Sequence, residues 1–240
     1  RGGEWHVVFS GADAAFVQER KDDPQADAAF FYENLGYARL DYAKEESAEK
    51  PYLFVAGFDE EALQELPILL TSGRMPENAG EILIPSHVAI KAGVRIPVGE
   101  SITLSLGQRE YEGSVLTQCD PYREGEELTV NEERTYLVTG TYERPGFELH
   151  EAPGYTVITR SDEGVQPDSY SVFVRLSNPG KVRDYAEGLT DGGSAALNEN
   201  LLRFLGVTDN RLLKAFFYVI GGVLAVIIMV ASVFLIYNSF

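Results

Sequence analysis

The sequence predicts an α+β fold in which a two-lobed, water-facing domain, residues 1–208, precedes one transmembrane helix. Strand-like and helix-like segments alternate near both ends of this domain, whereas its middle contains mainly strand-like segments. No side chain is charged from Ala215 to Phe240, although the chain has 37 acidic and 20 basic residues. We therefore expect a mixed α+β lobe at residues 1–77, an inserted mostly-β lobe at 78–160, the second half of the mixed lobe with a juxtamembrane helix at 161–208, and the transmembrane helix at 213–240.

The first part of the mixed lobe contains three strand-like segments, at residues 4–9, 37–42 and 52–58. A helix is expected over residues 13–20, with a continuation over 25–35 that ends at Gly36. Asp59 is expected to cap a short helix, because its carboxylate can accept hydrogen bonds from the free N–H groups of a first helical turn. Pro67 would end that helix.

The inserted lobe is expected to contain strands at residues 81–84, 101–106, 111–117, 135–142 and 155–159. Ser86 would cap a short helix that Gly93 closes. The segment from Arg144 to Phe147 suits a type II turn, because Pro145 and Gly146 occupy its two central positions.

The mixed pattern then returns with a strand at residues 170–176. Ser177 or Asn178 would cap the following helix, which has Pro179 in its first turn and ends near Gly188. A further helix is expected at residues 198–204.

The apolar segment from Ala215 to Tyr237 predicts a membrane crossing. As a helix it would rise about 34 Å, enough for a hydrocarbon core about 30 Å thick. Three small residues share one helical face and would let another helix approach closely: Gly221, Ala225 and Ser232. The alternatives are a buried helix of a water-soluble protein and a lone anchor in which these small residues occur by chance.

The composition excludes several classes of function. A formal net charge of −17 argues against nucleic acid or an anionic lipid surface as the partner of the domain. Cys119 is the single cysteine, so neither an internal disulfide nor a CxxC site can form. No GxxxxGK[ST] loop is present, so any coupled ATP hydrolysis would come from a separate chain.

We predict no catalytic residue, no cofactor and no metal site. His6, His87 and His150 are far apart in the sequence and fall in no HExxH frame, and no GxSxG turn presents a nucleophile. Glu148 and Glu151, beside His150, are expected to be surface acids. The acidic run at residues 120–133 is expected to be a solvated loop, because it lacks the spacing of a calcium loop.

Several segments between Leu63 and Phe240 resemble the FtsX-like, MacB-type permeases of ABC transporters. Gly73-Arg74-Met75-Pro76 followed by Glu81-Ile82-Leu83-Ile84-Pro85 is similar to the G-R-x-P…E-I segment of that family. Ala89, Gly93 and the stretch from Val98-Gly99-Glu100 to Leu104 resemble its A…G…G-D-x-I-x-L stretch. The strand from Tyr136 to Tyr142, which contains Gly140, also matches, although Thr139 and Thr141 replace the more usual Val and Ile. Asn238-Ser239-Phe240 resembles the end of the second transmembrane helix of the family.

This resemblance implies a domain between the first and second transmembrane helices of a multi-pass permease in the bacterial cytoplasmic membrane. Residues 1 to about 210 would be extracytoplasmic, whereas the basic residues before the helix, taken alone, would place the domain in the cytoplasm. The implied partners are a separate cytoplasmic ATPase subunit, other transmembrane helices of the same permease or of a second permease subunit, and membrane lipid. Export of amphiphiles such as antimicrobial peptides or lipoproteins, or resistance to them, would be the function.

Two other functions stay open. One is a non-transporting regulator that activates a cell-wall hydrolase, and the other is a single-pass receptor with an acidic ectodomain. Further apolar helices beyond Phe240 would favour a permease, whereas a signalling module there would favour a receptor.

Overall fold

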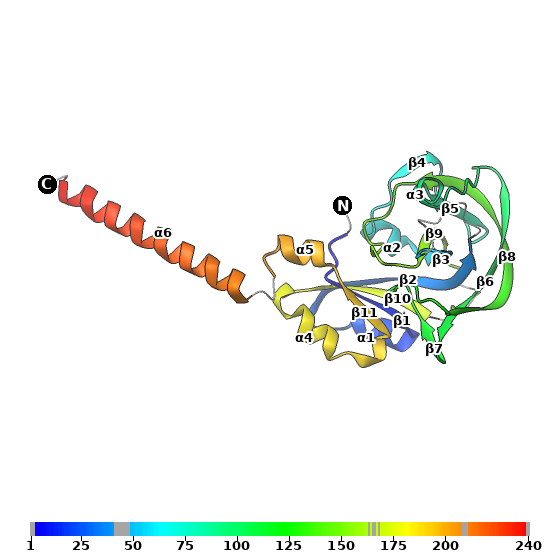
Figure 1. Cartoon of the computed structure of the whole chain (residues 1–240), viewed down its shortest axis with the longest axis horizontal. Coiled ribbons are helices and arrows are strands. Elements are labelled where there is room, and N and C mark those ends of the chain that lie inside the picture. The colour runs from blue at the N-terminus through cyan, green and yellow to red at the C-terminus, as the bar shows by residue number, and fades with distance from the viewer. Residues whose placement is uncertain are drawn as a thin grey trace. The chain divides into compact units, whose positions relative to one another are not determined.

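The computed structural model describes residues 3–40, 49–162, 164, 167, 169–207 and 211–238, and leaves out the side chains of residue 190 and of residues 211–218 and 235–238. The chain divides into two compact units, Arg1–Asn198 and Glu199–Phe240. The first unit, here called the domain, contains all the described strands (Figure 1). The second contains two helices, α5 (Glu199–Phe204) and α6 (Arg211–Asn238).

The domain is built on one mixed sheet of eleven strands. In sheet order these are β11 (Ser194–Leu197), β1 (Val7–Ala12), β10 (Ser169–Leu176), β2 (Ala26–Arg39), β3 (Tyr52–Phe58), β9 (Gly154–Arg160), β5 (Glu81–Pro85), β8 (Glu127–Tyr142), β6 (Ser101–Tyr111) and β7 (Ser114–Leu116), while β4 (Leu70–Gly73) pairs with β8. The predicted α+β class is therefore confirmed.

Part of this sheet closes on itself. The long strand β2 pairs with β10 along its first half and with β3 along its second half, and Tyr37 in the second half also pairs with Gly107 of β6. This last contact completes a ring in the order β2-β3-β9-β5-β8-β6, which we call the barrel. The strands β11, β1 and β10 lie outside the ring, and we call them the open flank.

Two apolar clusters explain why these segments are strands. The interior of the barrel takes alternate residues from all six of its strands, as the two-residue period of a strand requires. This cluster includes Leu53 and Val55 of β3, Ile82 and Ile84 of β5, Leu104 and Leu106 of β6, Tyr136 and Val138 of β8, and Tyr155 and Val157 of β9, with Ala38 and Leu40 at the end of β2. The intervening residues of β3, such as Phe54 and Phe58, enter a second cluster that joins the barrel to the open flank.

Short helices cover the open flank and the barrel. In α1 (Ala14–Lys21), Phe16 packs its ring against Phe9 of β1, with ring centroids 5.1 Å apart. Tyr185 of α4 (Val182–Glu187) meets the same Phe9 ring at 6.3 Å, so α1 and α4 cover one face of the flank (Figure 1). The other helices of the domain are α2 (Glu60–Glu65) and α3 (His87–Lys91).

Several local predictions are confirmed. The strand at residues 52–58 has the predicted limits. Asp59 caps α2, because its Oδ1 accepts a hydrogen bond from the Ala62 N–H at 2.8 Å. Asn178 caps the turn that starts at Pro179, where its Oδ1 accepts from the Gly180 N–H at 3.0 Å.

The predicted helix over residues 25–35 is wrong, because this segment is most of strand β2. Its alanines favour a helix locally, but its aromatic rings pack across the sheet: Phe30 stacks on Phe173 of β10 with centroids 5.5 Å apart. Gly36, expected to end a helix, instead takes a φ of 119° next to a register shift between β2 and β3.

One turn prediction and one capping prediction are also wrong. Gly146 lacks the positive φ that a type II turn needs, and the hydrogen bond from the Glu148 N–H to the Pro145 carbonyl places the turn one residue later. Ser86 precedes α3 as predicted, but its side chain makes no capping hydrogen bond.

In α6 the described apolar side chains are exposed, for example Val219 at 64%, Ile228 at 64% and Met229 at 66%. Within the described residues, no helix combines the length and the hydropathy that a membrane crossing requires. The domain boundaries at residues 77, 160 and 208 stay predictions.

Candidate functional site

The residues that carry the permease resemblance meet where β4, β5 and β8 come together. Gly73, the last residue of β4, has a φ of 77°, and a Cβ atom there would collide with the Thr139 carbonyl of β8. A Cβ atom on Gly140 would lie 2.6 Å from the Ser72 carbonyl oxygen. Both positions need glycine because the two backbones approach too closely for any side chain.

At the same junction, Arg74 forms a bidentate ion pair with Glu81, the first residue of β5. The two contacts are Nη1 to Oε2 at 2.7 Å and Nη2 to Oε1 at 2.6 Å. These hydrogen bonds from Arg74, and one from the Glu77 backbone N–H, lower the pKa of Glu81 to about 2.

The remaining motif residues also have structural positions. Pro76 is buried in the loop between Arg74 and Glu81. Gly99, with a φ of 92°, donates its N–H to the Val138 carbonyl of β8 at 2.8 Å. Asn238 is the last residue of α6, and Ser239 and Phe240 lie outside the described residues. The motif residues at this junction therefore fix how three strands meet.

A buried carboxylate, Glu148, is the centre of a second polar cluster. Its side chain is 0% exposed and accepts from Lys50 Nζ at 2.9 Å, from His87 Nε2 at 3.1 Å and from the Thr156 N–H at 2.8 Å. Burial alone would raise the pKa of Glu148, but the hydrogen bond from His87 and the charge of Lys50 outweigh it and lower the pKa to about 2. The expectation that Glu148 is a surface acid is therefore wrong.

Arg109 and Glu126 form a third polar cluster, and both side chains are 0% exposed. Arg109 Nε donates to Glu126 Oε1 and Nη2 to Oε2, both at 2.7 Å. Arg109 Nη1 also donates to the Thr117 carbonyl at 2.8 Å. This pair therefore holds the loop after β7 against β6.

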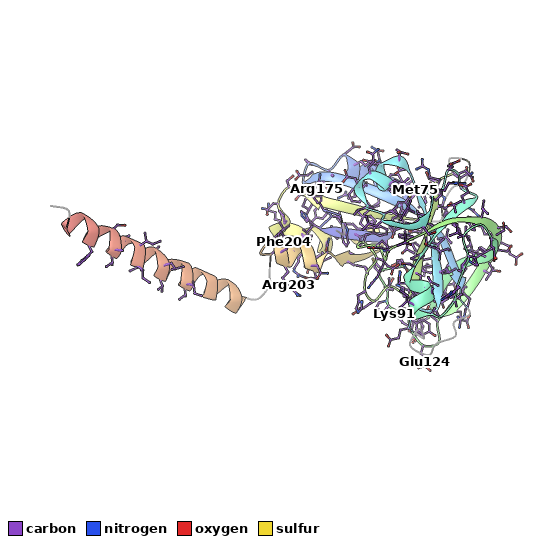
Figure 2. All side chains as sticks on the ribbon, turned by 90° about the horizontal axis from the view of Figure 1, so that it is seen from above. Met75, Lys91, Glu124, Arg175, Arg203 and Phe204 are labelled. Carbon is purple, nitrogen blue, oxygen red and sulfur yellow. The ribbon has the colours of Figure 1, made fainter. Side chains whose placement is uncertain are left out.

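The expected solvated loop at residues 120–133 is thus wrong in part. Glu126 is inside the domain and β8 begins at Glu127, whereas Glu124 lies at the outer margin of the domain (Figure 2). No sequence signal marked Arg109 as buried, because its partner lies beyond a turn and its neighbours in β6 are polar.

The histidines do not come together. His6 accepts the Leu176 N–H on Nδ1 at 3.0 Å, and burial lowers the pKa of its imidazole. His87 belongs to the Glu148 cluster, and His150 is exposed. Among the described residues, no group of three or more histidine, cysteine, aspartate and glutamate side chains is arranged to hold a metal ion.

A cavity of about 380 Å³ lies where β2 stops pairing with β10 and pairs with β6 instead. On the same edge of β2, pairing with β10 stops at Asn34 and pairing with β6 occurs at Tyr37. The two neighbours diverge at this fork and leave a space lined by Ser10, Asn34, Phe54, Val115 and Ser194, among others. No short stretch of sequence indicates this cavity, since its walls come from residues spread between positions 10 and 194.

The three small residues predicted to pack against another helix lie on α6. A Cβ atom on Gly221 would have no other atom within 4 Å, and Ser232 Oγ donates to the Ile228 carbonyl of its own helix at 2.8 Å. Helix packing through Gly221, Ala225 and Ser232 stays a prediction.

Comparisons with known proteins give similarity to solved structures alone. No family model matches the chain. No curated protein matches it either. The similar solved structures include the three that follow. A domain of a protein described as a permease from Porphyromonas gingivalis has 15% sequence identity and a TM-score of 0.37, covering 78% of this chain and 82% of its own.

The periplasmic region of MacB from Actinobacillus actinomycetemcomitans has 9% identity and a TM-score of 0.40, covering 87% of this chain and 95% of its own. The extracellular domain of YknZ, an ABC-type transporter from Gram-positive bacteria, has 10% identity and a TM-score of 0.38, covering 85% of this chain and 96% of its own. At these identities and scores, no residue role transfers from those proteins to this chain.

Proposed function

We propose that this chain is the outer domain and one membrane-spanning helix of an ABC-type permease in the bacterial cytoplasmic membrane. The observation that carries the proposal is α6, a helix of 28 residues whose described side chains are apolar or small, with the apolar ones exposed. The uncharged sequence from Ala215 to Tyr237 would rise about 34 Å as a helix, enough for a hydrocarbon core about 30 Å thick. A helix that is apolar on all sides needs an apolar environment, which a membrane supplies.

The permease assignment is supported by the order of the motif residues in the sequence. A cytoplasmic ATPase on a separate chain would drive the protein, and the outer domain would transmit a change of shape. The domain suits this task because one sheet connects its barrel and its open flank through β2. Such a body moves as a whole when one of its ends is displaced.

The described residues that follow α5 form a closed helix end. Helix α5 ends in a Schellman motif, in which the Val207 N–H bonds the Leu202 carbonyl at 2.8 Å and the Gly206 N–H bonds the Arg203 carbonyl at 3.1 Å. Gly206 has the left-handed φ of 75° that this motif requires. A helix end closed in this way has little freedom to absorb a displacement.

An insertion tests the proposal. Ten Gly-Ser residues placed between Val207 and Arg211 should abolish transport or resistance in cells, because a flexible linker would uncouple the domain from α6. The ATPase should still copurify, and the domain should still melt cooperatively. The matched control is the same insertion after Glu112, in the exposed turn between β6 and β7, which should leave function intact.

Other outcomes point to other functions. Full activity with the longer linker would contradict mechanical coupling and favour a tethered receptor. Copurification of a cell-wall hydrolase with the outer domain, without any transported cargo, would favour the regulator.

A further inference from the structure

The fork between β10 and β6 brings both ends of the sheet to one cavity. Among the described strands, β11 pairs only with β1 and β7 pairs only with β6, so each has a free edge. Ser194 of β11 and Val115 of β7 both line the cavity. Its volume of about 380 Å³ is within the usual range for ligand sites, about 300–1,000 Å³.

None of the described residues that line this cavity is charged, although the chain carries a net charge of −17. The apolar part of the lining includes Phe54, Val115 and Leu116. The polar part consists of hydroxyl and amide side chains with backbone groups. A charged ligand group would lose its hydration here without gaining an opposite charge, so the lining selects an uncharged ligand.

The first wall of the cavity, on β2 and β10, has hydrogen-bond donors that its own hydrogen bonds leave unused. Ser171 Oγ donates to Asn34 Oδ1 at 2.8 Å, and Asn34 Nδ2 donates to Ser169 Oγ at 2.9 Å. The hydroxyl hydrogen of Ser169 and the second N–H of Asn34 take no part in these two bonds, since Ser169 accepts and an amide nitrogen has two hydrogens. Within the described part of the chain no other side-chain hydrogen bond uses these two groups, so both can donate to a ligand.

The second wall, on β11 and the loop after β7, presents acceptors. Ser194 Oγ and Thr117 Oγ1 both donate to Asp120 Oδ2 at 2.8 Å. A hydroxyl has a single hydrogen, so these two can offer only lone pairs in any other direction. A ligand that contacts both walls must therefore accept from the first and donate to the second.

We propose that this cavity binds a short, uncharged peptide segment in an extended conformation. An extended main chain carries the C=O and N–H groups that the donor and acceptor walls require. The free edges of β7 and β11 offer it the strand pairing by which peptides add to sheets. Apolar side chains of the peptide would contact Phe54 and Val115. This inference is independent of the proposed transport function, because a receptor or a regulator could use the same cavity.

The test is a titration of the full chain in detergent micelles with acetyl-Val-Thr-Val-amide, followed by the amide signals of ¹⁵N-labelled glycines. Four glycines line the cavity: Gly11, Gly36, Gly107 and Gly193. Their signals should shift and saturate at millimolar peptide. Gly80, Gly99 and Gly125 lie outside the lining and should not move.

Two variants locate the site. Val115→Trp should fill the cavity and abolish the shifts, because Val115 is 58% exposed and a larger ring fits there without disturbing the core. Val98→Trp is the matched control, since Val98 is 42% exposed and lies outside the lining. Ser169→Ala should weaken binding about twofold to tenfold by removing one donor, whereas Thr103→Ala on an exposed part of β6 should not.

Several results would overturn the proposal. These are unmoved cavity glycines, equal shifts with maltose or with acetyl-Glu-Glu-Glu-amide, and unchanged binding in Val115→Trp. Equal shifts with maltose would assign the cavity to neutral polyols instead.

Equal melting temperatures of the two tryptophan variants would exclude misfolding as the cause of lost binding.

Discussion

The domain buries some of its charged side chains, whereas α6 exposes its apolar ones. The domain buries charged groups: the side chains of Arg109, Glu126 and Glu148 are all 0% exposed. In α6 the apolar side chains of Ile228 and Met229 are exposed by about two thirds, at 64% and 66%. Among the described residues of the domain, each buried charge has a charged partner in hydrogen-bond contact, which offsets its lost hydration. The described apolar side chains of α6 have no comparable cover, so the difference indicates that the two regions are built for different surroundings.

Separating the two regions should have the largest effect. A fragment that ends at Val207 should be monodisperse without detergent and melt cooperatively, because the domain contains its own apolar clusters. The full chain should need detergent or lipid to stay dispersed. Size-exclusion chromatography and thermal melting measure both. Aggregation of the fragment under mild conditions would show that the domain depends on the helix.

Breaking the buried ion pair should have the next largest effect. Arg109→Met leaves Glu126 buried without its partner, and should lower the free energy of unfolding by about 3–5 kcal/mol in urea melts. The double variant Arg109→Met with Glu126→Leu should recover most of this loss. Arg134→Met is the control, because the Arg134–Glu132 pair is partly exposed and should contribute less than about 1 kcal/mol. A loss of equal size in both single variants would mean that burial does not decide the value of the pair.

A bulky residue on the small face of α6 should have an intermediate effect. Gly221→Leu should hold a neighbouring helix away and weaken assembly in the membrane by about 1–3 kcal/mol. Gly222→Leu is the matched control on a different face of the helix. The measurement is the fraction of chain recovered in a larger complex after detergent extraction. Equal assembly of the two variants would show that the small face is incidental.

The smallest effect concerns Glu33 of β2. Burial raises the pKa of its carboxyl to about 7, and the nearby charges of Asp59 and Asp162 act in the same direction. A folded-state pKa above the ordinary value of 4.5 means that this carboxyl favours folding while it is protonated. The contribution is full below about pH 4.5 and is lost as the pH rises through about 7.

Glu33→Gln should therefore melt at a higher temperature than the natural chain at pH 8, and the difference should shrink towards pH 4. Melting curves across this range measure it. A difference that stays constant with pH would show that ionisation of Glu33 does not affect stability.

Elements with local signals were predictable from the sequence. The run from Tyr52 to Phe58 is apolar throughout because both faces of β3 are buried. Asp59 and Asn178 mark the first residues of helical turns, because a capping side chain bonds an N–H group two or three residues further along the chain.

Features set by distant residues were not predictable. The segment of β2 before Gly36 has helix-favouring alanines, and only its pairing with β10 and β3 makes it a strand. The burial of Arg109 depends on a partner 17 residues away that lies across a turn. The residues that line the cavity are spread from Ser10 to Ser194, so no short stretch of sequence indicates it.

The pairing of early with late strands also sets the order in which the domain can form. β1 finds its neighbour only when Val7 meets Val174, and β3 finds one of its two neighbours only when Tyr52 meets Gly154. Chains dominated by such distant pairings fold slowly, on the order of milliseconds to seconds. The entropy cost of closing long loops comes before the stabilising contacts form. During synthesis, β1 must therefore wait with both edges open until β10, which ends at residue 176, has emerged. A chaperone that covers those edges, or rapid delivery of the growing chain to the membrane, would then decide how much of the protein reaches its final shape.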